Sequence, residues 1–140
     1  MTQFGVDVTT EDVLDALTFF DAWEDRYKYL IDLGKELPAM SDELKTDATL
    51  VRGCQSQVWL SPTLEDNRWY FAADSDAFIV KGLLCLVLAA YNGKTSSEIL
   101  AFDIDEYFAK LDLLSHLSST RGNGLKSMVG RIRDYAQKPA

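Results

Sequence analysis

Cys54 is the residue whose type and setting point most directly to chemistry. It lies in the polar stretch 52–57, between two runs of β-branched and aromatic residues. Gly53 precedes it and permits a sharp turn, because glycine adopts backbone angles that other residues avoid. A free thiol has a pKa of about 8.5, and a nearby cation such as Arg52 lowers it. Isolated cysteines mostly serve packing, so the residues alone leave Cys54 open as either a nucleophile or an inert core residue.

The second cysteine and the single histidine have weaker claims to chemistry. Cys85 lies within the apolar run 83–91, where a thiol behaves as a small hydrophobic side chain, and we expect it in the core. His116 lies next to leucines and has the chemistry of a general base for a nucleophilic cysteine. A lone histidine in that setting is more often a half-buried core or capping residue. Two cysteines and one histidine are too few for a structural zinc site, which usually takes four such ligands.

Two further clusters resemble ligand sites. Asp74 and Asp76 are spaced like a metal-binding acid pair, but acids also gather at helix N-termini, where they cap the helix and interact with its dipole. We expect the capping role. Residues 121–124, Arg-Gly-Asn-Gly, resemble a phosphate-cradling turn, yet they lack the lysine and the spacing of a P-loop. Neither cluster predicts a bound cofactor or metal.

Length, composition and charge limit the class of protein. The 140 residues, 47% of them apolar, predict a single domain over 1–140 with a buried core, in which residues 1–8 lack periodicity and fray. A net charge of -8 argues against nucleic-acid binding, which needs a basic patch to displace counterions. The longest apolar run is much shorter than the ~20 residues of a membrane span. With no signal-peptide pattern, we expect a cytoplasmic protein with free thiols.

The chain pattern predicts an α+β domain. Thr9 and residues 95–98 have capping-box chemistry, and the turn residues 65–67 predict a hairpin. The expected elements, in chain order, are helices at 9–17 and 21–34, strands at 49–51, 57–60 and 68–71, and helices at 76–91, from 95, from 103 and over 125–135. Together they predict a small three-stranded antiparallel sheet covered by helices.

Three ordered blocks of this sequence resemble the SufE family of sulfur-acceptor proteins. The first is Gly-Cys-Gln-Ser-Gln-Val-Trp at 53–59, the second lies within 74–83 and the third within 116–128. The similarity extends over about residues 19–136. Three blocks in order are far more specific than any one motif. The resemblance implies the fold that this family shares with IscU-type scaffold proteins, which agrees with the α+β prediction.

The resemblance also implies a function in sulfur transfer. Members are partners of a cysteine desulfurase of the SufS or CsdA type, which uses pyridoxal phosphate to take sulfur from L-cysteine and holds it as a persulfide. The acceptor cysteine, matched here by Cys54, receives that sulfur, stimulates the desulfurase and passes sulfur on to an iron–sulfur scaffold. Such thiol exchange needs no cofactor on this chain. The residues expected to support Cys54 or to dock the partner are Gly53, Gln55, Asp74, Asp76 and Arg121.

Two other functions remain as alternatives. One is a hydrolase with Cys54 as nucleophile and His116 as base, which would turn over a substrate without a desulfurase. The other is an iron–sulfur scaffold, disfavoured because clusters are held by several thiolates. For the leading hypothesis, we expect Arg121 near the Cys54 loop. We also expect the thiol to be sheltered in an apolar cavity until the partner docks.

Overall fold

The computed structural model describes residues 4–5, 7–54 and 56–138 and has the α+β architecture that the sequence predicts. The elements in order are α1 (Thr10–Phe19), α2 (Trp23–Gly34), η1 (Asp42–Leu44), β1 (Val58–Glu65), β2 (Arg68–Ser75), α3 (Phe78–Tyr91), β3 (Lys94–Thr95), α4 (Ser96–Ala101), α5 (Ile104–Leu111), η2 (Leu114–His116) and α6 (Ser119–Gln137). The sheet is antiparallel in the order β1-β2-β3.

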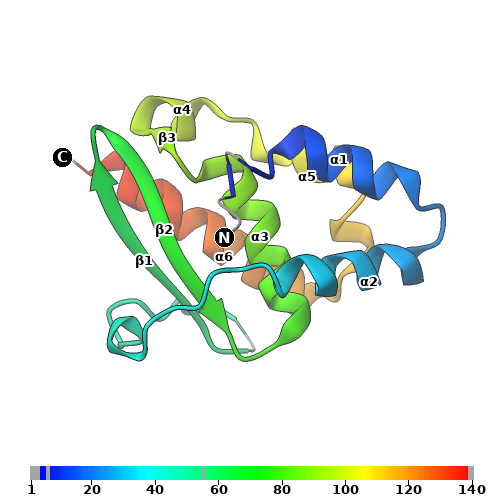
Figure 1. The fold of residues 1–140 in the computed structure, drawn as a ribbon, viewed down its shortest axis with the longest axis horizontal. Helices are drawn as coiled ribbons and strands as arrows, with labels where there is room; N and C mark the ends of the chain where they lie inside the picture. Colours follow the sequence, from blue (N-terminus) through cyan, green and yellow to red (C-terminus); the bar gives the residue numbers. More distant parts are fainter. Residues whose placement is uncertain (1–3, 6, 55, 139–140) are drawn as a thin grey trace.

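Helix α3 is the centre of the molecule (Figure 1). It contacts α1, α2, α6 and β2, and its residues from 82 to 91 are all buried. A helix enclosed in this way is apolar all round, which explains the long apolar run. Helix α2 comes very close to it, because a Cβ on Gly82 would lie 2.2 Å from the Leu30 carbonyl oxygen. Gly34 is likewise needed for close approach, since a Cβ there would lie 2.8 Å from the Gly82 nitrogen.

The third strand is not the one that the sequence predicted. Residues 49–51 make only a bridge-like contact beside β1, in which Val51 donates to the Val58 carbonyl at 2.7 Å and Leu60 donates to that of Thr49 at 2.8 Å. The segment then turns away into the Cys54 loop and forms no strand. The true third strand is β3, which pairs with the start of β2. Two residues are too few to show the alternation that identifies a strand.

Helix starts were predicted correctly at Thr9, Thr95 and Asp103 and incorrectly at Asp21 and Asp76. Thr9 and Thr95 each form a complete capping box, and Asp103 caps α5. Asp21 and Asp76 cap no helix, because α2 and α3 begin after alanines without a side-chain cap. The Asp76 carboxylate instead accepts a hydrogen bond from the main-chain amide of Gln57 at 3.1 Å.

The N-terminal segment is held to the core rather than frayed at the residues that the structure describes. Phe4 is 2% exposed, and its carbonyl accepts a hydrogen bond from the Asn92 side-chain amide at 2.9 Å. Gly5 has a φ of +90° and lies so close to Asn92 that a side chain would not fit. The remaining early residues, 1–3 and 6, lie outside the described part. Within that part, no helix is long and apolar enough to cross a membrane.

Candidate functional site

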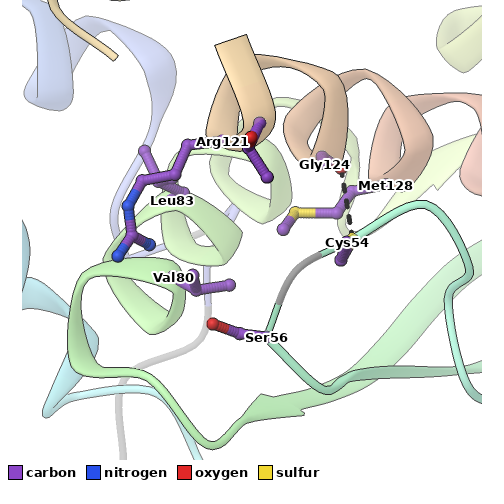
Figure 2. Close-up of a pocket in the computed structure, with 8 residues that line it drawn as sticks. Cys54, Ser56, Val80, Leu83, Arg121, Gly124 and Met128 are labelled. Atoms are coloured by element: carbon purple, nitrogen blue, oxygen red, sulfur yellow. Dashed lines mark hydrogen bonds between the residues drawn. The ribbon is translucent and has the colours of Figure 1, made fainter. Parts of the chain in front are cut away.

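Cys54 lies in the loop before β1, at a point where this loop touches helix α6. Gly53 has a φ of +89°, so the sharp turn predicted at this glycine is confirmed. A Cβ on Gly53 would also lie 2.7 Å from the Ser127 hydroxyl of α6. Its lack of a side chain therefore lets the loop lie against the helix. The Cys54 Sγ then donates to the Gly124 carbonyl at 3.6 Å (Figure 2).

The thiol borders a small cavity between the loop, α3 and α6. The cavity has a volume of about 20 Å³ and is lined by Cys54, Ser56, Val80, Leu83, Thr120, Arg121, Gly124 and Met128. Figure 2 shows Val80 and Leu83 of α3 and Met128 of α6 surrounding this space. A volume of this size holds about one water-sized group. The thiol is therefore half-buried beside a mainly apolar space with room for one further small atom.

The surroundings keep the Cys54 thiol protonated in the resting protein. Burial raises the pKa of the Cys54 thiol above its ordinary value, because desolvation disfavours the thiolate. Arg121 lines the same cavity, so the structure brings these two predicted residues together. Its side chain extends past Leu83, however, and its guanidinium points away from Cys54 in Figure 2. Desolvation is the cause of the raised pKa, and neither Arg52 nor Arg121 lowers the thiol pKa in this state, contrary to what the neighbouring cation suggested.

Asp74 and Asp76 tie neighbouring segments to the sheet. Burial opposes ionisation of Asp74, but Lys45 at 2.9 Å, the Ser75 amide and Lys81 at 3.6 Å together hold the pKa of this carboxyl below its usual value. No group of three or more metal-ligating side chains occurs among the described residues. Gln55, the remaining predicted support residue, lies outside the described part of the chain.

His116 does not belong to the Cys54 site. It is exposed, in contrast to the half-buried position expected for it, and its ring stacks on Trp23 with 4.0 Å between centroids. Its Nδ1 lies 3.1 Å from both the Asp112 carbonyl and the Ser115 hydroxyl. His116 is absent from the cavity lining as far as the structure describes it. This arrangement gives a Cys54 nucleophile no histidine base.

Cys85 is the core residue that the sequence predicts. It is 0% exposed, and its Sγ donates to the Leu33 carbonyl at 3.5 Å. Burial first, and then the charge of Glu36, raise the pKa of Cys85 to about 12. Such a thiol carries almost no negative charge near neutral pH and is inert as a nucleophile.

Sequence reasoning missed the residues that build the cavity around Cys54. Val80 and Leu83 are three apart on α3, and Gly124 and Met128 are four apart on α6, so each pair shares a helix face. Helical periodicity identifies such faces as apolar, but it does not show which part of a face is left uncovered. Lys45, which anchors the preceding segment on Asp74, gave no signal in the sequence.

Comparison with known proteins relates most of the chain to one protein family. A family model described as "SufE: Fe-S metabolism associated domain" matches residues 11–136. SufE-like proteins of unassigned function from Rhizobium etli and Rhizobium meliloti are 50% and 46% identical to the chain. Each alignment covers 91% of this chain and, respectively, 88% and 94% of the relative.

A relative with an assigned role and a solved structure complete the comparison. The sulfur acceptor protein CsdE of Escherichia coli is 41% identical over 92% of this chain and 88% of its own length. The solution structure of a hypothetical protein from Thermus thermophilus superimposes with a TM-score of 0.74, covering 91% of this chain and 93% of that one. At 15% identity, this last likeness shows a shared fold alone.

Proposed function

The chain belongs to the SufE family, and on that premise we propose that it accepts sulfur from a cysteine desulfurase onto Cys54 for iron–sulfur cluster assembly. The observation that carries the proposal is the setting of Cys54. The thiol lies on a glycine-turned loop beside a cavity with room for one small atom. The relationship to a protein named as a sulfur acceptor supports the same role.

The proposed step is a thiol–persulfide exchange. The Cys54 thiolate attacks the terminal sulfur of the desulfurase persulfide, and the sulfur–sulfur bond of that persulfide breaks. The desulfurase cysteine leaves as a thiolate with the bonding electron pair, while Cys54 becomes the persulfide. The proton lost by Cys54 balances the one taken up by the leaving thiolate, so no oxidant or reductant is consumed.

We propose that the loop shelters the thiol at rest and presents it when the partner docks. The raised pKa of Cys54 slows attack, because the thiolate is the nucleophile. Turning outward about Gly53 would rehydrate the thiol and bring its pKa back toward the ordinary value. The desulfurase would then select or induce the outward loop. This step would contribute to the stimulation of the desulfurase.

Two side chains, one in the cavity lining and one at the start of α3, are suited to docking the desulfurase. Arg121 lines the cavity and uses its side chain for no hydrogen bond or ion pair within the described part of the chain. Phe78, the first residue of α3, is 66% exposed although it is large and apolar. Aromatic residues are enriched at protein–protein interfaces, so this exposed ring is suited to contact a partner.

We propose that the chain acts as an accessory protein with no turnover of its own. Pyridoxal phosphate stays on a desulfurase of the SufS or CsdA type, and this chain needs no cofactor for the exchange. An iron–sulfur scaffold or another acceptor would receive the sulfur. The cytoplasm suits this role, because its reducing conditions keep acceptor thiols free.

The proposal is tested by intact-mass spectrometry after incubation with a SufS-type desulfurase, pyridoxal phosphate and L-cysteine. The expected result is a gain of one sulfur, lost on treatment with a reductant, and no gain when the desulfurase is omitted. No gain despite a persulfide on the desulfurase would contradict the acceptor role. Turnover of an ester or amide substrate by this chain alone would favour the hydrolase.

A further inference from the structure

Arg131 of α6 clamps the segment that leads into the Cys54 loop. Its Nη1 donates to the Leu50 carbonyl at 3.1 Å, and its Nη2 donates to the carbonyl of Ala48. Its Nε donates to the Tyr135 hydroxyl at 3.2 Å. Within the part of the chain that the structure describes, Arg131 forms no ion pair. Its charge is therefore directed at neutral main-chain oxygens about eighty residues earlier in the sequence.

The clamp belongs to a series of contacts between one face of α6 and the loop. Gly124 accepts the hydrogen bond of Cys54, and Ser127 lies beside Gly53. Residues 124, 127 and 131 follow one another at spacings of three and four and so share one helix face. Of these three, Arg131 provides the contact that holds the loop segment by more than one hydrogen bond.

The Arg131 guanidinium also packs against the Tyr135 ring, which in turn contacts the sheet. The guanidinium carbon of Arg131 lies 5.6 Å from the centre of the Tyr135 ring, and that ring stacks on Trp69 of β2 with 6.2 Å between centroids. Trp69 is buried, so Tyr135 packs on the core while it contacts the arginine. The planar guanidinium, supported in this way, loses less conformational freedom when it binds the two carbonyls.

We propose that Arg131 is a positioning residue that holds the segment before Cys54 on α6 and so keeps the thiol sheltered in the resting protein. The link to sulfur transfer rests on the proposed function, whereas the positioning itself does not. A hydrogen bond from a charged donor is among the stronger ones in proteins. Removing the clamp should therefore raise the population of the open loop on the order of tenfold.

The chain offers a matched control on the same helix. Arg133 also directs its guanidinium at two main-chain carbonyls, those of Ile99 at 3.4 Å and Leu100 at 3.5 Å. These carbonyls belong to α4, far from Cys54 in the sequence. Arg131→Ala and Arg133→Ala thus remove the same group from the same helix, but they release different segments.

The test measures alkylation of Cys54 by a small thiol reagent in the folded protein, together with amide hydrogen exchange. Arg131→Ala should raise the Cys54 alkylation rate on the order of tenfold and speed exchange of the Leu50 and Val51 amides. Arg133→Ala should leave both unchanged and speed exchange in α4. Arg131→Lys, a point charge without the two-pronged fork, should fall between wild type and Arg131→Ala.

Three results would overturn the inference. One is an unchanged Cys54 rate in a folded Arg131→Ala protein, and another is an equal increase in Arg133→Ala, which would indicate general destabilisation. If Arg131→Ala does not fold, an unchanged rate in Arg131→Lys is the third. No desulfurase enters the experiment, so a failure of sulfur transfer would leave this result standing, and the reverse also holds.

Discussion

The two cysteines of this chain have similar immediate partners but very different surroundings. Each Sγ donates to a main-chain carbonyl of a packed helix, Cys54 to Gly124 and Cys85 to Leu33, and burial raises the pKa of both thiols. Cys85 lies inside the central helix, however, whereas Cys54 lies on a loop turned by Gly53. A local opening would therefore be enough to expose the half-buried Cys54 fully, while Cys85 would be exposed only when the core unfolds. On the proposed function, the element that carries a thiol, more than its hydrogen bond, decides whether it serves transfer or packing.

The largest expected effect comes from exchanging the two thiols for other side chains. Cys54→Ser should abolish sulfur acceptance and desulfurase stimulation with the fold intact, because a hydroxyl cannot hold a persulfide. Cys85→Ala should keep both activities. Its free energy of unfolding should fall by about 1 kcal/mol or more, because removing the buried sulfur leaves a void. Desulfurase assays with both variants, each checked by circular dichroism, measure this. Loss of transfer in Cys85→Ala with transfer retained in Cys54→Ser would reverse the assignment.

Reagent accessibility should separate the two thiols by orders of magnitude. Near neutral pH, Cys54 should react more slowly than a cysteine peptide, and Cys85 should react only at the rate of global unfolding, roughly a thousandfold or more below an exposed thiol. Because burial raises the Cys54 pKa, its rate should keep rising above the pH at which the peptide levels off. Peptide-resolved alkylation across this range measures both thiols in one sample. A Cys54 rate equal to that of the free peptide would exclude the sheltered resting state.

The burial of Cys85 should make the free energy of unfolding fall as the pH becomes alkaline. Its pKa is raised from 9.0 to about 12 in the folded protein, so its contribution to stability is complete below about pH 9. Between these values the unfolded chain releases the proton while the folded chain keeps it. The free energy of unfolding then falls by up to about 1.4 kcal/mol per pH unit from this group.

Urea unfolding of wild type and Cys85→Ala from about pH 8 to about pH 10 isolates that slope. The buried tyrosines Tyr91 and Tyr107 also have raised pKa values, but they are present in both proteins and cancel in the difference. The variant should lose less stability over this range than wild type. Parallel curves would mean that Cys85 is less buried than its 0% exposure implies.

The smallest expected effect concerns docking at the rim of the Cys54 cavity. Arg121→Ala should weaken desulfurase stimulation severalfold, while the melting temperature stays within error, because the guanidinium has no partner in the described part of the chain to lose. Titration of the desulfurase with wild type and variant measures the shift in the half-maximal concentration. Unchanged stimulation would remove Arg121 from the docking surface.

The sequence indicated the candidate site but did not indicate how the fold builds it. Gly53 and Cys54 are neighbours, so a turn that presents the thiol follows from local chemistry. Threonine caps are equally local, and Thr9 and Thr95 were predicted correctly. The Asp76 carboxylate accepts a hydrogen bond from the main-chain amide of Gln57. This contact depends on which strands pair, and no sequence spacing predicts it.

The same limit applies to the longest-range contacts. Arg131 lies 81 residues after Leu50 and 83 residues after Ala48, the two residues whose carbonyls it binds. Carbonyl groups carry no sequence signal, because every residue has one. Sequence patterns identify side chains by type, whereas a main-chain oxygen gains its role only from where the fold places it. Phe4 was missed for a related reason, because its burial depends on Asn92 at the far end of α3.

The most direct test of the transfer account is to locate the transferred sulfur. After reaction of wild type with the desulfurase and L-cysteine, free thiols and persulfides are trapped by alkylation, and the peptides that carry Cys54 and Cys85 are compared by mass spectrometry. The account predicts one additional sulfur on the Cys54 peptide and none on the Cys85 peptide. Sulfur on the Cys85 peptide, or on neither while the desulfurase itself holds a persulfide, would contradict it.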